Sequence, residues 1–186
     1  MKTFLRFVWV ALIKIQRIVM LFTIVFCTLA IFSQAVMRYV FHSPFVGIEE
    51  MGAYFAFWLY FIGASYGSYE RSHIRAELTH LFFGTSKKYA LCRAATSFIS
   101  FGTAAFAIPW AYDYVLWGIM KNEQSRATFL GSTYPVFWFQ ASILVGLALM
   151  AFYFFVEFIQ WVRIIAGKDQ IPEEMIAARK EVESWI

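Results

Sequence analysis

The 186-residue chain is 61% hydrophobic and 21% aromatic, with only 15% charged residues. Soluble domains carry roughly 25% charged residues, so this composition excludes an ordinary soluble globular protein. The formal net charge of +4 calls for no nucleic-acid partner, because basic residues beside an anionic leaflet of the lipid bilayer account for it.

Four stretches of the chain lack Asp, Glu, Lys, Arg and His. A transmembrane helix needs roughly 20 apolar residues to cross a hydrocarbon core about 30 Å thick, and lipid leaves the backbone no other hydrogen-bond partners. The stretches are Ile18–Met37, Met51–Tyr69, Ala94–Tyr112 and Ala127–Val156. We therefore predict an all-α integral membrane protein with a four-helix transmembrane domain over residues 17–165. Its helices are expected at about 17–41, 48–70, 87–118 and 133–165.

The two ends of the chain are expected to lie outside this domain. Residues 1–16 mix basic and apolar side chains, which favours an amphipathic helix along the cytoplasmic surface. The alternative is a simple extension of the first membrane helix. We expect no cleaved signal peptide, because no small-residue cleavage site follows the apolar core. Residues 166–186 are predicted to be a cytoplasmic tail with a short helix.

Proline and capping residues indicate where two of the helices begin. Pro44 separates the first helix from the second, since proline does not continue a helix. Ser132 or Thr133 is expected to cap the fourth helix, with Pro135 in its first turn.

Basic residues predict the orientation. All but three of the 16 Lys and Arg residues lie before the first helix, between the second and third, or after the fourth. The three exceptions are Arg38, Lys121 and Arg126. Cytoplasmic loops carry the excess of Lys and Arg. Both termini are thus predicted to be cytoplasmic, and the protein is expected in the inner membrane of a bacterium.

The stretch RYVFHSPFVGIEE, residues 38–50, places one base and two acids around the first outer turn. Acids in the first turn of a helix favour its positive dipole end. We predict that Arg38 pairs with Glu49 and Glu50 and fixes how the first two helices meet, inside this subunit or with a partner. A catalytic pair of carboxylates is the weaker interpretation.

The stretch GASYGSYERSHIRAEL contains a GxxxG pattern formed by Gly63 and Gly67, a signal for close helix packing. Charged residues and a histidine follow at the inner end of the second helix. They either form a solvated loop or hold the second helix to the third helix or to a partner. The candidates are Glu70, Arg71, His73 and Glu77.

Asp113 lies near the outer surface among aromatic residues and is expected to be an interface group. None of the four stretches carries a charge at its middle, where transporters place ion pathways. Metal, haem and nucleophile motifs are also absent from the sequence. We therefore expect neither an enzyme nor a cofactor, and a four-helix bundle that serves a larger assembly. Two alternatives stay open: a stand-alone small transporter or channel, and the membrane anchor of a redox enzyme.

The chain resembles the small membrane subunit, of DctQ type, of tripartite ATP-independent periplasmic (TRAP) transporters. The resemblance covers about residues 15–165. It rests on the four helices, on RYVF and GIEE before the second helix, and on WLYFIGASYGSYERSHIRAEL, where His73, Ile74 and Glu77 match the family register. Many members have Asp where this chain has Ala76 or Glu77.

The resemblance implies a scaffold role in uptake of organic acids by sodium symport. The partners would be a large multi-helix membrane subunit, which would hold the substrate and sodium sites, and a periplasmic substrate-binding protein. No substrate, catalytic or metal site is then expected in this chain.

Overall fold

The computed structural model describes residues 2–43, 45–70, 87–128 and 131–168, and these form four long helices. They are α1 (Lys2–Tyr39), α2 (Val46–Glu70), α4 (Lys87–Lys121) and α5 (Phe137–Ile165). An all-α protein is confirmed for the described part of the chain. The expected Arg71, His73 and Glu77 lie outside the described residues, as does the tail beyond residue 168.

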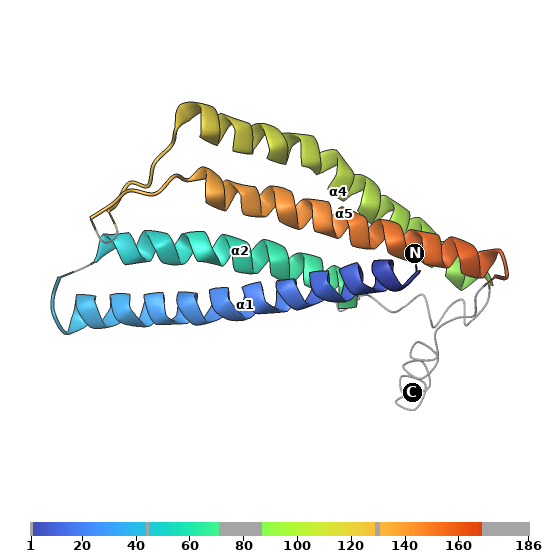
Figure 1. The fold of residues 1–186 in the computed structure, drawn as a ribbon, viewed down its shortest axis with the longest axis horizontal. Coiled ribbons are helices and arrows are strands. Elements are labelled where there is room, and N and C mark those ends of the chain that lie inside the picture. Colours follow the sequence, from blue (N-terminus) through green and yellow to red (C-terminus); the bar gives the residue numbers. More distant parts are fainter. Residues whose placement is uncertain (1, 44, 71–86, 129–130, 169–186) are drawn as a thin grey trace.

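The helices form one flat row in the order α1, α2, α5, α4 (Figure 1). α2 packs on α1, α5 packs on α2, and α4 packs on α5. The predicted four-helix bundle is thus an open row in the described part of the chain. Toward the tail end of α5, Tyr153 also contacts Gln16 and Trp9 of α1. Elsewhere the described helices keep open faces on both sides of the row, and they surround no lumen.

Successive helices along the chain run in opposite directions, so α2 and α5, which are neighbours in the row, are parallel (Figure 1). The molecule therefore has two ends. We call the end with residues 40–45 and 122–136 the hairpin end. The other end, with the start of α1 and the last turn of α5, is the tail end (Figure 1).

The helix α1 begins earlier than the transmembrane domain was expected to begin. It runs without a break for 38 residues from Lys2, about 57 Å at 1.5 Å per residue. The separate surface helix over residues 1–16 is therefore wrong in the structure, and the alternative, an extended first helix, fits it. No Pro or Gly stands between Lys2 and Tyr39 to interrupt the backbone hydrogen bonds.

The start of α5 also differs from the expectation. Val136 is its N-cap and no side chain caps it, so neither Ser132 nor Thr133 has that role. Residues before the helix instead close a hairpin with the end of α4. Pro135 bridges Gln124, and the Ser125 amide donates to the Tyr134 carbonyl at 2.8 Å. These contacts keep the residues before α5 in an extended conformation, so the helix begins only at Phe137.

Three helices are long and apolar enough to cross a membrane: α1 from Phe7, α4 and α5. The helix α2 is 25 residues long, but Tyr, Gly and Ser residues lower its hydropathy. The structure thus supports a multi-pass membrane protein. The crossing of α2 and the direction of the termini stay predictions.

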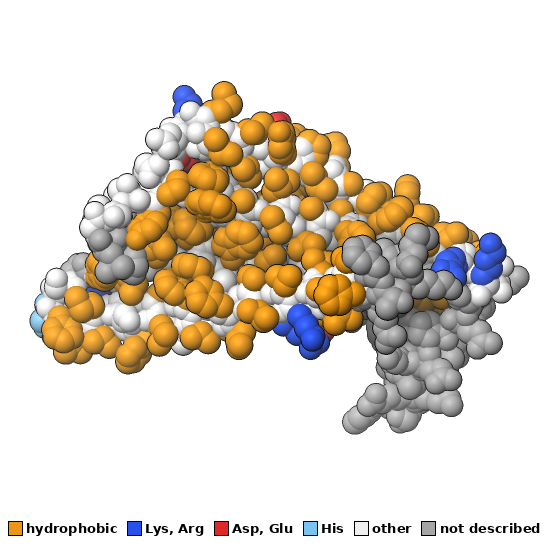
Figure 2. Space-filling model, in the orientation of Figure 1, with side chains coloured by type: hydrophobic (Ala, Val, Ile, Leu, Met, Phe, Trp, Pro, Cys, Tyr) orange, Lys and Arg blue, Asp and Glu red, His pale blue; other side chains and the backbone are white. Residues whose placement is uncertain are grey.

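Large apolar side chains cover much of the surface (Figure 2). The largest buried apolar group lies between α4 and α5, where Trp161 and Tyr89 pack on Ala90 and Ala94. Elsewhere the buried residues are mostly small, because neighbouring helices touch along narrow seams. Such exposed apolar faces fit lipid or another membrane protein.

Candidate functional site

Glu50 joins α2 to the α4–α5 connection at the hairpin end. Its two carboxylate oxygens accept hydrogen bonds from the backbone amides of Arg126, at 3.0 Å, and Ala127, at 2.7 Å. The Tyr54 hydroxyl donates to the same carboxylate at 2.5 Å. The Tyr54 ring stacks on Phe139 of α5 with centroids 4.0 Å apart. Glu50 therefore anchors a connection 76 residues away in the sequence.

The predicted pairing of Arg38 with these acids is not present within this subunit: among the described residues, Arg38 has no ion pair with Glu49 or Glu50. Its pairing with a partner subunit stays a prediction. Glu49 instead accepts a hydrogen bond from Gln34 Nε2 at 3.0 Å. Successive residues of a helix point about 100° apart, so the two acids cannot face the same neighbour. Glu49 faces α1, whereas Glu50 faces the α4–α5 connection.

A buried polar chain joins three helices nearer the tail end. The Tyr153 hydroxyl of α5 donates to Gln16 Oε1 at 2.8 Å, and Gln16 Nε2 donates to Ser65 Oγ of α2 at 3.1 Å. Ser65 Oγ donates in turn to the Ile62 carbonyl. Gln16 is 2% exposed, so losing one partner would leave a buried polar atom without a hydrogen bond. This series of hydrogen bonds fixes the register of α1, α2 and α5.

Arg17, next to Gln16, makes an exposed cluster with the end of α2. Its Nε donates to the Tyr66 hydroxyl at 2.7 Å, and its guanidinium lies 3.9 Å from Glu70. The Tyr66 hydroxyl donates to Glu70 as well. Glu70 thus pairs with α1 of the same chain. The expected contacts of this segment were with the third helix or a partner, so the contact of Glu70 with α1 is one that the sequence did not predict.

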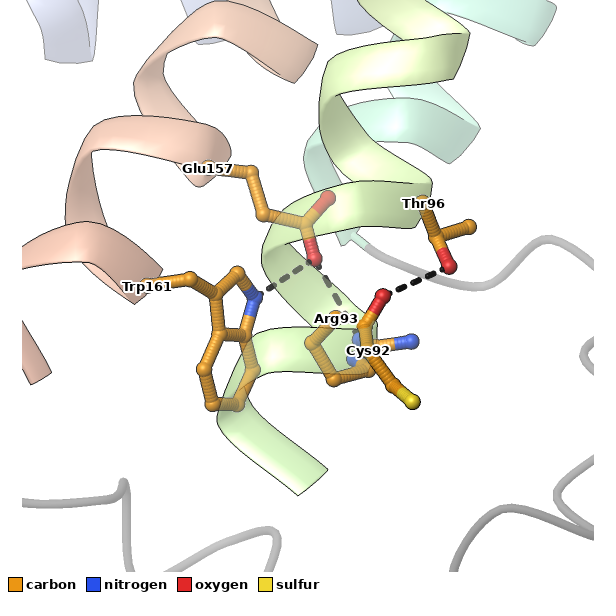
Figure 3. A network of polar contacts seen from close by, with 5 residues as sticks. All are labelled: Cys92, Arg93, Thr96, Glu157 and Trp161. Atoms are coloured by element: carbon orange, nitrogen blue, oxygen red, sulfur yellow. Dashed lines mark hydrogen bonds and ion pairs between the residues drawn. The ribbon is translucent and has the colours of Figure 1, made fainter. Parts of the chain in front are cut away.

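A third polar group ties α4 to α5 (Figure 3). Arg93 donates to Glu157 Oε1 at 3.3 Å, and the Trp161 indole N–H donates to the same oxygen at 3.3 Å. The Arg93 guanidinium also lies 5.4 Å from the centre of the Trp161 ring. Both charged side chains are mostly buried, with 13% and 9% exposed. The pair is therefore shielded from water and lies in the α4–α5 seam.

Close helix packing occurs at a glycine outside the GxxxG pattern. A Cβ on Gly63 would meet only Met20 Sδ at 3.9 Å, an ordinary contact, so Gly63 is not a point of close approach in this chain. A Cβ on Gly146 would lie 2.6 Å from Phe61 Cβ and 2.9 Å from the Phe61 carbonyl oxygen. Gly146 marks the close crossing of α5 on α2. Gly67 is half-buried in α2.

Asp113 lies exposed on α4, the outer helix of the row. Exposed aromatic residues of the same helix surround it in sequence, including Trp110 and Trp117. This position leaves Asp113 available to a partner or to lipid headgroups, and its expected interface role stays a prediction. Within the described residues, no three His, Cys, Asp or Glu side chains gather as metal ligands would.

The sequence did not reveal the partners of Gln16, Glu50 or Arg93. Arg93 was counted only as a base near a predicted membrane end, and Gln16 as part of a surface segment. A polar residue within an apolar helix was the available signal, since such groups usually face protein in a membrane. The partners themselves depend on how the row packs.

Comparisons with known proteins agree with this architecture. The model for the DctQ component of tripartite ATP-independent periplasmic transporters matches residues 27–164, which cover α2 and α4 completely, nearly all of α5 and the last third of α1. No curated protein sequence matches the chain. The family is a transporter component rather than an enzyme, and it works with a large membrane subunit and a substrate-binding protein. The chain therefore belongs to the DctQ family, the small membrane components of TRAP transporters.

Proposed function

We propose that this chain is the scaffold subunit of a sodium-coupled secondary transporter for organic acids. It would hold the large transport subunit in the membrane and widen the surface on which a periplasmic binding protein docks. Family membership supports a role in a TRAP transporter. The observation that carries the scaffold role is the single row of helices, which offers broad apolar faces and cannot surround a solute path alone (Figures 1 and 2).

The proposal includes four membrane crossings with both termini in the cytoplasm of a bacterial cell. Two contacts support the crossing of α2. Glu50, in its first turns, bonds to Ala127 at the hairpin end, and Glu70, its last residue, lies near Arg17 toward the tail end. These contacts support the proposal that α2 spans the same layer as α1 and α5. The excess of Lys and Arg predicted for the tail end supports a cytoplasmic position of both termini.

In this proposal the substrate and sodium sites belong to the large subunit. Sodium and carboxylate sites in transporters are built from charged residues and broken helices near the middle of the bilayer. None of the described helices is interrupted along its length, and the described residues contain no cluster of metal ligands. The organic-acid class follows the family resemblance alone.

Reconstitution into liposomes tests this role. The chain alone, the large subunit alone and the two together would be assayed for sodium-driven uptake of labelled succinate and labelled sialic acid, with the binding protein outside. We expect uptake of one of them only when both membrane subunits are present. Uptake by the chain alone would favour the stand-alone transporter, and undiminished uptake by the large subunit alone would rule out a required scaffold.

A further inference from the structure

A groove of about 320 Å³ lies between α1 and α2 near the hairpin end. From Cys27 to Arg38 its α1 wall covers about 16 Å at 1.5 Å per residue, roughly half of a hydrocarbon core. Most of the lining is small and apolar. These lining residues include Cys27, Ala30, Ile31, Gly52, Ala53 and Ala56.

The end of the groove nearest the hairpin carries opposite charges. Arg38 and Glu49 both line it, and Arg38 has no ion pair with any other described residue. Glu49 accepts a bond only from Gln34, whose own amide oxygen is enclosed without a hydrogen-bond partner among the described residues. The groove therefore offers a cation in the last turn of α1 and an anion in the first turn of α2.

We propose that this groove binds one phospholipid with a zwitterionic, primary-amine headgroup, of the phosphatidylethanolamine class. The phosphate would contact the Arg38 guanidinium, which matches phosphate oxygens in charge and geometry. The ammonium group would donate to Glu49. An acyl chain would lie along Ala53, Ala56 and Cys27, so that the lipid fills the seam between α1 and α2.

The shape of the groove favours a lipid over a helix of a partner protein. Its volume of about 320 Å³ is smaller than the volume of a helix about 10–12 Å wide over the same length. The charges lie where α1 ends, at the depth where headgroups meet the hydrocarbon. This inference requires only that α1 crosses the membrane, and it holds whether or not the scaffold role is correct.

Lipid retention by the purified full-length chain tests the proposal. Native mass spectrometry would measure adducts after addition of phosphatidylethanolamine, phosphatidylcholine or phosphatidylglycerol. Arg38→Gln removes the cation, and Ala53→Leu fills the groove without changing charge. Lys121→Gln is the matched control, because Lys121 is an exposed base at the end of α4.

We expect the unmodified chain and the Lys121→Gln control to retain phosphatidylethanolamine in preference to the other two lipids. Phosphatidylcholine lacks an N–H to donate to Glu49, and phosphatidylglycerol has no cation. Arg38→Gln should lower retention on the order of tenfold, the loss of one charge-assisted bond. Ala53→Leu should lower it too. Equal retention of the three lipids, or unchanged retention in both variants, would overturn the proposal.

A photoactivatable residue at position 31 gives a second measurement that does not depend on detergent. Illumination of membranes from cells with the whole transporter should yield a lipid adduct of this chain. A crosslink to the large subunit in place of lipid would show that a protein fills the groove and would also overturn the proposal.

Discussion

At the scale of single residues, the molecule uses its few polar side chains to join segments far apart in sequence. Glu50 illustrates the principle. It satisfies two backbone amides of the connection between α4 and α5. Charge-assisted hydrogen bonds of this kind are stronger than neutral ones. Glu49, the adjacent acid, receives one bond from a side chain and is exposed.

The two neighbouring acids make a matched test. Glu50→Ala should lower the free energy of unfolding by about 2 kcal/mol, because it leaves two amides and the Tyr54 hydroxyl without their acceptor. Glu49→Ala should cost clearly less. Unfolding by denaturant in one detergent, followed by tryptophan fluorescence, measures both. Equal losses from the two substitutions would show that the anchor at Glu50 has no special role.

The Arg93–Glu157 pair predicts a coupling between two substitutions. Arg93→Met alone leaves the Glu157 charge buried without its partner and should cost roughly 3 kcal/mol. Adding Glu157→Gln removes that charge and keeps an acceptor for the Trp161 indole. The double variant should therefore be more stable than Arg93→Met alone. A double-mutant cycle on the unfolding free energy measures the coupling, and simple addition of the two losses would contradict it.

Residue contacts were the part that the sequence predicted least well. The base and acids at residues 38–50 were expected to pair because they flank one turn. Opposite charges near a turn do not determine which face of its helix each side chain occupies. Adjacent residues of a helix point about 100° apart, so Glu49 and Glu50 contact different partners. Glu157 and Arg93 are 64 residues apart. Nothing local in the sequence indicates that they meet.

At the scale of helices, seams form where side chains are small or absent. The crossing of α2 and α5 depends on Gly146, since Phe61 backbone atoms lie where a Cβ would be. Gly102 of α4 offers the opposite case, because a Cβ there would meet nothing within 4 Å. Both glycines are inside helices, so the effect of each on helix propensity is the same.

This contrast gives the third prediction. Gly146→Ala should destabilise the protein by about 1–3 kcal/mol, because α2 and α5 must move apart. Gly102→Ala should leave stability unchanged or raise it by up to about 1 kcal/mol, since alanine favours a helix. The same unfolding measurement separates the two. Equal effects would mean that the α2–α5 crossing is not tightly packed.

The positions of the second and third helices were predicted well from apolar stretches alone, whereas the starts of α1 and α5 were not. The second helix was expected at 48–70 and α2 is Val46–Glu70; the third was expected at 87–118 and α4 is Lys87–Lys121. Hydropathy and backbone hydrogen bonding act locally, which explains this success. The single row could not be predicted, because both a row and a bundle bury some apolar surface and lipid accepts the rest.

At the scale of the whole molecule, the two connections lie at the same end of the row. Glu50 bonds directly to Arg126 and Ala127, so the turn before α2 and the turn before α5 cannot be on opposite sides of a bilayer. If α1, α4 and α5 cross the membrane, α2 must also cross. A chain with only three crossings would place these turns on opposite sides and break the bonds to Glu50.

Cysteine labelling distinguishes the two topologies. In a chain with Cys27 and Cys92 replaced by serine, Ser43→Cys and Ser132→Cys test the two turns, and Lys168→Cys tests the position after α5. We expect an impermeant maleimide to label positions 43 and 132 in spheroplasts and position 168 only after lysis, because four crossings put both turns outside. Labelling of position 43 without position 132 would indicate three crossings. Labelling of position 168 alone in spheroplasts would reverse the orientation that the basic residues predict.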